Sequence, residues 1–345
     1  MAGAEREAAM AGYGTRPTMK DVASHAGVAL KTVSRVVNGE PGVRPQTADR
    51  VNGSIAALGY RRNDSARVLR KGQTASIGLI LEDIGDPFYA TLSRAVEDVA
   101  AEHGTLLITG SSDEDAEREQ ELALSFCARR VDGLIIIPAS QDHTYLLPEV
   151  AAGTAVVFVD RPPQLIDADT VLTGNVTGAR DGVTHLVRHG HRRIGFIGDA
   201  PHIYTASHRL QGYTQAMSAA GLAAEGSWVS MAPPTPLSVR DALDRMLGGP
   251  APVSAVLCGN NRITALALRE LHATGSPIAL VGFDDLELAD LLTPAVTVVA
   301  QDTAGLGRIA AQLLFRRLDG YQGPVERVEL ATTLIVRGSG EVPPS

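Results

Sequence analysis

The sequence predicts an α/β protein whose body contains two doubly wound parallel sheets, preceded by a small all-α module at the N-terminus. Three observations lead to this prediction: short amphipathic helical patterns in residues 18–62, alternating apolar runs and helical segments after residue 75, and an uneven division of charge. Strands that alternate with helices are typical of parallel sheets covered on both faces. The number of such units suggests two lobes.

The predicted strands of the body are continuous apolar runs, as expected of parallel strands buried on both faces. They lie at residues 77–81, 106–108, 134–137, 155–159, 194–197, 255–258 and 278–281. The pattern between them predicts helices at residues 89–103, 115–129 and 179–189. Ligands of open α/β sheets bind beyond the carboxyl ends of the strands, so residues that follow strands are the first site candidates. These positions are polar or aromatic here and include Asp83, Asp86, Phe88, Tyr89, Asp160, Arg161, Asn260, Asn261, Asp284 and Asp285.

Three short helices are predicted in the N-terminal module, at residues 20–26, 30–38 and 46–58. Thr18 and Asp21 fit a capping box, and Gly27 supplies the tight turn of a helix-turn-helix. The second helix turns its valines to one face at i, i+3 and i+4 spacing. Its other face is short and polar, and can donate hydrogen bonds to base edges and phosphates. That face carries Lys31, Thr32, Ser34 and Arg35.

Charge supports a nucleic-acid partner for this module although the whole chain carries −8. Residues 18–71 contain ten Lys and Arg against four acids, whereas the body contains 19 basic and 33 acidic residues. A basic module on an acidic body confines phosphate attraction to one end. Charge alone would equally describe a solvated helix surface.

Other features favour a cytoplasmic protein. No apolar stretch is long enough to span a membrane, so no membrane partner is expected. Residues 1–17 lack the apolar core of a secretory signal and are expected to form a disordered extension. Cys127 and Cys258 are too few for a disulfide framework and suit a reducing compartment.

Several motifs together resemble one known family. Thr18-Met-Lys-Asp-Val-Ala, Thr32-Val-Ser-Arg-Val-Val-Asn-Gly and Leu58-Gly-Tyr60 resemble the headpiece of lac repressor (LacI/GalR) family transcriptional regulators. The resemblance implies that residues 18–62 form a DNA-binding headpiece whose second helix enters the major groove. It assigns base reading to Leu30, Lys31 and Arg35, and phosphate contacts to Thr32, Ser34, Tyr60 and Asn63. Arg and Lys can donate to guanine, and Leu can contact a thymine methyl group.

This headpiece departs from the family pattern at two helix starts. Arg44-Pro45 stands where the third helix usually opens with Ser and Glu. The family usually places Ser at the cap of the recognition helix, and here that residue is Ala29. Alanine cannot cap, so we expect the helix to lose about 1 kcal/mol. This predicts a headpiece that orders fully only on DNA.

Residues 63–74 resemble the hinge of the family, which forms a helix when paired in a dimer on DNA. The resemblance makes Leu69 a wedge in the minor groove and places Arg70 near the phosphates and the groove floor. The alternative is a plain linker with one exposed leucine.

The resemblance also implies that residues 75–345 form a two-lobed, periplasmic-binding-protein-like domain for effector binding and dimerisation. The N-lobe would comprise residues 75–172 and 302–330, and the C-lobe residues 173–300 and 331–340. The implied effector ligands, each with a structural loop role as its alternative, are Asp86, Phe88, Tyr89, Arg209, Trp228, Asn260, Asp284 and Gln301. Carboxylate, amide and guanidinium groups beside aromatic rings suit the hydroxyls and apolar face of a sugar.

Neither a metal nor a cofactor is predicted. His185, His189 and His191 have metal-like spacing, but no acid or cysteine lies beside them in the sequence, so a structural role is expected. Gly195-Phe-Ile-Gly198 does not match a dinucleotide fingerprint. With no catalytic constellation in view, the chain is not expected to be an enzyme.

The predicted function is a sequence-specific repressor that binds a near-palindromic operator as a homodimer under the control of a carbohydrate effector. No C-terminal heptad segment for tetramerisation is seen, which favours the dimer. A sugar-transport protein built on the same body is the main alternative, and the headpiece argues against it. The identity of the effector, its action as inducer or corepressor, and activation versus repression stay open.

Overall fold

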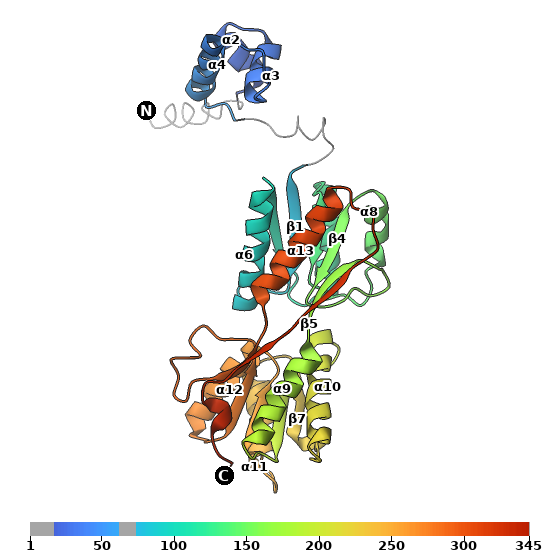
Figure 1. The fold of residues 1–345 in the computed structure, drawn as a ribbon, viewed down its shortest axis with the longest axis vertical. Helices are drawn as coiled ribbons and strands as arrows, with labels where there is room; N and C mark the ends of the chain where they lie inside the picture. The colour runs from blue at the N-terminus through green and yellow to red at the C-terminus, as the bar shows by residue number, and fades with distance from the viewer. Residues whose placement is uncertain (1–16, 62–73, 345) are drawn as a thin grey trace, which may run out of the picture. The chain divides into compact units, whose positions relative to one another are not determined.

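The computed structural model describes residues 17–61 and 74–344, and the chain divides into two compact units at Thr74 and Ala75. The first unit contains helices α2 (Met19–Ala26), α3 (Leu30–Val37) and α4 (Pro45–Leu58), coloured blue in Figure 1. Val22, Val33 and Val51 are fully buried at its centre. The predicted helix-turn-helix is confirmed.

The helix starts of the first unit follow the local sequence. At α2, the Thr18 amide donates to Asp21 Oδ2 at 2.7 Å and the Asp21 amide donates to Thr18 Oγ1 at 3.4 Å, which confirms the capping box. Gly27 ends this helix with φ of 62°, a conformation that favours glycine. Helix α3 has no side-chain cap at Ala29, so the expected defect is present.

The N-lobe of the second unit is a six-stranded parallel sheet in the order β11-β5-β4-β3-β1-β2. Its strands are β1 (Ser76–Leu81), β2 (Leu106–Ser111), β3 (Gly133–Ile136), β4 (Ala155–Val159), β5 (Asp169–Thr173) and β11 (Arg327–Leu330). Helices α6 (Pro87–Glu102) and α13 (Thr303–Leu318) pack side by side against one face (Figure 1). Helices α7 (Ala116–Ala128) and α8 (Leu147–Ala151) complete this lobe, and the core of its other face includes Phe126 and Phe158.

The C-lobe repeats this plan in the order β12-β10-β9-β8-β6-β7. Its strands are β6 (Ile194–Gly198), β7 (Val229–Met231), β8 (Ala255–Cys258), β9 (Ala279–Phe283), β10 (Thr297–Ala300) and β12 (Thr333–Ile335). Its helices are α9 (Asn175–Arg188), α10 (Tyr204–Ala219), α11 (Pro236–Gly248) and α12 (Asn261–Thr274). Strand β12 pairs antiparallel with β10 at the sheet edge, which the strand pattern did not predict.

The chain passes between the lobes three times: from β5 to α9, from β10 to α13 and from β11 to β12. The predicted two-sheet α/β fold is therefore confirmed. Helix α9 begins at Asn175 rather than at residue 179. Gly178 hid this first turn from the sequence pattern, because glycine is a poor helix former, and its place is explained by close packing against the sheet. A Cβ atom at Gly178 would come within 2.9 Å of Val299 in β10.

Among the described residues, every helix is too short or too polar to cross a bilayer.

Candidate functional site

Helix α3 has the amphipathic character that the sequence predicts for base reading. Leu30 is 44% exposed and Lys31 is exposed, whereas Val33 is fully buried in the small core. Arg35 is half-exposed, and its Nε lies 4.0 Å from Glu40 Oε2. Exposed ion pairs of this kind contribute little, so the Arg35 side chain can exchange this contact for another at small cost.

The other predicted DNA contacts divide into three groups. Thr32 and Ser34 are partly exposed on α3, and Ser34 Oγ accepts a hydrogen bond from Asn38 Nδ2 at 3.2 Å. Tyr60 is only 7% exposed because its ring packs in the headpiece core. The structure thus gives Tyr60 a packing role that the sequence prediction did not include. Asn63, Leu69 and Arg70 lie outside the described residues.

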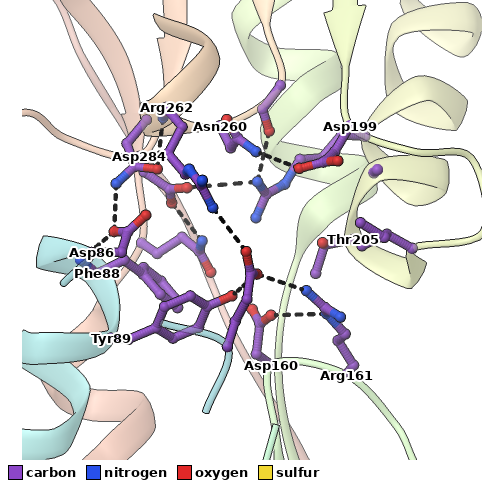
Figure 2. A pocket seen from close by; sticks show the side chains of 17 residues that line it. Asp86, Phe88, Tyr89, Asp160, Arg161, Asp199, Thr205, Asn260, Arg262 and Asp284 are labelled. Carbon is purple, nitrogen blue, oxygen red and sulfur yellow. Dashed lines mark hydrogen bonds and ion pairs between the residues drawn. The ribbon is translucent and has the colours of Figure 1, made fainter. Parts of the chain in front are cut away.

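A polar pocket of about 480 Å³, part of it open to solvent, lies between the two lobes (Figure 2). Side chains from both lobes line it, and most of them follow the carboxyl ends of strands. Its charged lining residues are Glu82, Asp86, Asp160, Arg161, Asp199, Arg209, Arg262 and Asp284. Phe88, Tyr89 and Ile203 supply an apolar part of the wall.

Arg209 on α10 holds the C-lobe side of the pocket together. Its Nε donates to Asn175 Oδ1 at 2.7 Å, and its Nη1 donates to the carbonyl of Gly259 at 2.7 Å. The same Nη1 lies 3.6 Å from Asp284 Oδ2, and the guanidinium carbon lies 3.8 Å from the centre of the Phe283 ring. At 4% exposure, the guanidinium is fixed before any ligand binds.

Asp160 and Asp284 occupy equivalent places in the two lobes. Each directly follows a strand, β4 or β9, and each has a positive φ, 69° and 68° respectively. This conformation is costly for a residue with a side chain, and such positions concentrate at functional sites. Burial raises the pKa of both carboxyls, although Arg209 acts on each in the opposite direction.

Two acceptor atoms in the pocket are buried without a hydrogen-bond partner among the described residues: Asp160 Oδ1 and Gln301 Oε1. The other end of the Gln301 amide donates to Asp284 Oδ1, which fixes the direction of the side chain. A buried acceptor without a donor is unfavourable, so these atoms favour a bound group that carries O–H or N–H donors.

The N-lobe side of the pocket is a connected network centred on Glu82. The Tyr89 hydroxyl donates a hydrogen bond to Glu82 Oε2 at 2.8 Å, and Arg161 Nη2 donates to the same oxygen at 3.4 Å. Arg161 also pairs with Glu114 and donates to the carbonyl of Pro138 at 2.8 Å. Burial and the nearby Glu114 carboxylate raise the pKa of Glu82.

Two direct contacts join the lobes across the pocket. Arg262 Nη1 of α12 lies 3.0 Å from Glu82 Oε1, and Asn261 Nδ2 donates to Asp86 Oδ1 at 2.7 Å (Figure 2). The Asp86 carboxylate also caps α6 by accepting from the Phe88 amide at 2.9 Å. A ligand that displaces these side chains would compete with contacts between the lobes.

The structure brings most of the predicted effector residues around this pocket: Asp86, Phe88, Tyr89, Arg209, Asn260, Asp284 and Gln301. Trp228 requires a correction. It is 6% exposed, packs in the C-lobe core and donates its indole N–H to the carbonyl of Ala251 at 3.2 Å. Because it is buried elsewhere, it is not among the pocket residues and does not present a stacking surface there.

Sequence reasoning missed three charged pocket residues: Glu82, Asp199 and Arg262. Glu82 and Asp199 directly follow β1 and β6, so the strand-end rule could have found both. Arg262 stands in the first turn of α12 beside the predicted Asn260, and its partner Glu82 is 180 residues away in the sequence. No local pattern reveals that pairing.

Two family models match the chain. Residues 18–63 match "Bacterial regulatory proteins, lacI family", and residues 183–340 match "Periplasmic binding protein-like domain". Among curated relatives, the regulator CelR of Thermobifida fusca is 34% identical over 94% of this chain and 98% of its own length. The regulator GalS of Salmonella typhimurium is 31% identical over 88% of this chain and 90% of its own length.

Solved structures agree with these matches. The lac repressor dimer bound to operator and the anti-inducer ONPF superposes with a TM-score of 0.83 at 25% identity, covering 94% of this chain and 99% of that one. A CelR–cellobiose complex covers 94% of this chain and 100% of its own at a TM-score of 0.69 and 31% identity. These relatives are transcriptional regulators rather than enzymes, in agreement with the sequence prediction. The chain therefore belongs to the LacI family of bacterial regulatory proteins, with a helix-turn-helix domain followed by a periplasmic-binding-protein-like body.

Proposed function

We propose that this protein is a transcriptional repressor that binds a near-palindromic operator as a homodimer and is controlled by a carbohydrate effector. The pocket between the lobes is the main support for this proposal. It combines fixed donors, the guanidinium groups of Arg209 and Arg161, with two buried acceptors that lack a donor. These acceptors are Asp160 Oδ1 and Gln301 Oε1. Vicinal hydroxyls of a sugar can both accept from the guanidinium groups and donate to these acceptors.

The charge of the pocket narrows the effector class. Its lining contains five carboxyl side chains and three arginines. An anionic ligand such as a sugar phosphate would meet uncompensated negative charge, and this repulsion disfavours it relative to a neutral sugar of similar size. The cellobiose bound by the related CelR is a neutral disaccharide, which supports the same class for this chain.

The proposed control acts through the contacts that join the lobes. A sugar in the pocket would replace the Arg262–Glu82 and Asn261–Asp86 contacts with contacts through its own hydroxyls. An effector can change operator affinity only by binding two arrangements of the lobes with different affinity. The dimeric state is supported by the related lac repressor, whose operator complex is a dimer.

DNA selection and a ligand screen together test this proposal. Purified full-length protein is used to select duplexes from a random pool, and separately to measure thermal shifts with neutral saccharides and with sugar phosphates. We expect one enriched, near-palindromic duplex and stabilisation by a neutral saccharide. Absence of any preferred duplex would refute the regulatory role, whereas stabilisation by sugar phosphates alone would refute the proposed effector class.

A further inference from the structure

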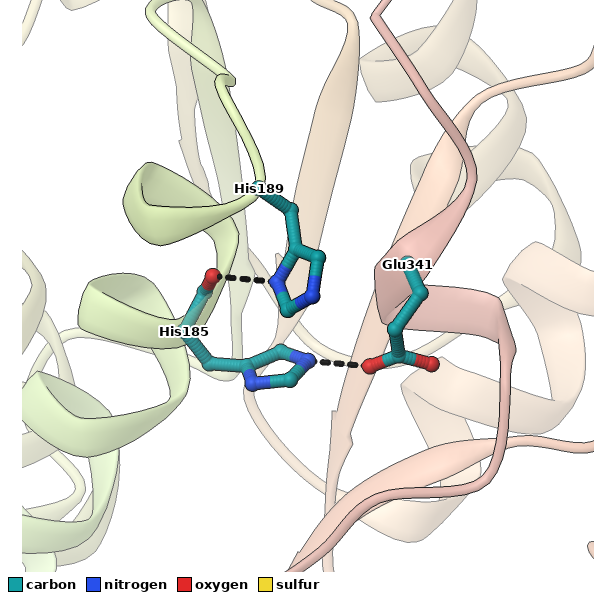
Figure 3. A group of neighbouring side chains, drawn as sticks. All are labelled: His185, His189 and Glu341. Carbon is teal, nitrogen blue, oxygen red and sulfur yellow. Dashed lines mark hydrogen bonds and ion pairs between the residues drawn. The ribbon is translucent and has the colours of Figure 1, made fainter.

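Two histidines and a carboxylate meet at the end of α9 that is remote from the effector pocket. His185 and His189 are one helical turn apart near the C-terminus of α9, and Glu341 lies in the short helix η3 (Ser339–Glu341) (Figure 3). Asn175, which binds Arg209 in the pocket, stands at the other end of the same helix. An acid at this place could not be predicted from local sequence, because Glu341 is 156 residues from His185 along the chain.

The three side chains are close enough to share one ion. One potential ligand atom from each lies within 4.8 Å of the others. The spacing of His185 and His189 at i and i+4 puts both imidazoles on one face of the helix. His185 Nε2 already contacts the Glu341 carboxylate. His185 is buried, Glu341 is half-buried and His189 is exposed, so an ion can reach the cluster from solvent.

At His189, a hydrogen bond to one ring nitrogen leaves the other nitrogen for coordination. His189 Nδ1 lies 2.9 Å from the carbonyl oxygen of His185, an acceptor, so Nδ1 carries the proton and Nε2 keeps its lone pair. A ring nitrogen that donates to a backbone carbonyl is the usual arrangement of a metal-binding histidine.

Glu341 has an orienting partner of its own. The Thr297 hydroxyl accepts from the amides of Arg337 and Gly338, at 2.9 Å and 3.2 Å, so its proton points to Glu341 Oε2 at 3.2 Å. His191 is different, because its ring nitrogens are paired with Ser254 Oγ and the carbonyl of Val342, each at 2.9 Å. The third histidine of the motif is therefore structural, and only His185 and His189 are available.

We propose that His185, His189 and Glu341 bind a divalent transition-metal ion, with Zn²⁺ as the best match and water completing the coordination. Two imidazoles and one carboxylate suit Zn²⁺, and the carboxylate offsets part of its charge. Tetrahedral Zn²⁺ with bonds of 2.0–2.2 Å places ligand atoms about 3.3–3.6 Å apart. The exposed His189 side chain can turn to make this adjustment. The bound ion would fasten η3 to α9 and stabilise the C-lobe.

Calorimetric titration of the chelator-treated full-length protein with ZnSO₄ tests the site. We expect one Zn²⁺ per chain, and thermal stability that rises with Zn²⁺. His189→Ala removes an exposed ligand, and Glu341→Gln keeps the shape of the side chain but removes its charge. Loss of an outer-shell partner alone weakens metal affinity about 10–100-fold, so we expect each variant to lose at least about tenfold. Substitution with Co²⁺ should give the intense visible absorption of a tetrahedral site in the wild type and lose it in both variants.

His272→Ala is the matched control, because His272 is also an exposed histidine in the last turn of a C-lobe helix, α12. It should bind Zn²⁺ like the wild type. No Zn²⁺ binding at micromolar concentration, or equal affinity in wild type, His189→Ala and Glu341→Gln, would show that the cluster is only an ion pair and would overturn the proposal.

Discussion

The headpiece and the body differ in how their candidate binding surfaces are built. The surface of α3 comes from one stretch of eight residues, and the helix packs on a single core around Val22, Val33 and Val51. The pocket draws its side chains from positions between Glu82 and Gln301, carried by both lobes. A continuous surface can be predicted from local periodicity, whereas a pocket of this kind depends on contacts that only the fold creates.

The two regions also differ in how far their functional groups are fixed. Arg35 has one exposed ionic contact with Glu40 at 4.0 Å and retains its freedom. Arg209 is held by Asn175, Gly259 and Asp284 and is only 4% exposed. We therefore expect substitutions in the pocket to remove a preformed site, and substitutions on α3 to remove one contact at a time.

The largest expected effect is that of Arg209→Ala on the effector response. The substitution leaves Asp284 buried without its cation and Asn175 Oδ1 without its donor, so we expect effector affinity to fall at least about 100-fold, or about 3 kcal/mol. Calorimetry with the effector measures the loss, and operator binding without effector should be unchanged. Circular dichroism of the variant and of Arg209→Lys controls for misfolding. A normal effector response in Arg209→Ala would contradict the proposed difference between a preformed pocket and the separate contacts of α3.

Arg35→Ala should weaken binding to the selected operator by about 1–3 kcal/mol and relax the preference at one base position. Fluorescence anisotropy on the operator and on random duplexes separates base reading from phosphate contact. Arg50→Ala changes an exposed arginine of α4 outside the predicted reading face and is the control. Equal losses of affinity for operator and random DNA would show that Arg35 contacts only phosphate.

Ala29→Ser should stabilise α3 by about 1 kcal/mol, because a serine hydroxyl can accept from a free amide at the helix start. Hydrogen exchange of the full chain without DNA should show slower exchange in α3 and no change in the body. If the α3 amides of the wild type were already well protected, the headpiece would not need DNA to order, and the sequence-based expectation would be wrong.

The smallest expected effect on the effector is that of Trp228→Phe. The variant loses the bond from the indole N–H to Ala251, which lowers stability by about 1 kcal/mol, while effector affinity should stay within about twofold. Comparing thermal unfolding with calorimetric titration separates the two properties. A large loss of effector affinity without loss of stability would restore the ligand-stacking role that the structure does not support.

Much of the fold followed from the sequence, and the failures have physical causes. Long apolar runs such as residues 155–159 predict buried strands because a central parallel strand is apolar on both faces. Short edge strands such as β7 and β12 lack that signal. Glycines at 174 and 178 concealed the first turn of α9, and close packing against Val299 of β10 requires the glycine at 178.

The candidate site was predictable where its residues follow strands, as Asp160 and Asp284 do. It was not predictable where a residue acts through a distant partner, as Arg262 does with Glu82 and His185 does with Glu341. Trp228 failed for a related reason, because resemblance to a family assigns a position in the sequence but does not determine which way its side chain faces.

We expect α3 to read base edges and the body to determine when it does so. The affinity of full-length protein for its selected operator, measured at one fixed salt concentration with and without the stabilising saccharide, tests this claim most directly. We expect operator affinity to change at least about tenfold, with binding to random DNA nearly constant and the response absent in Arg209→Ala. An operator affinity that is the same with and without a saturating saccharide would contradict this claim.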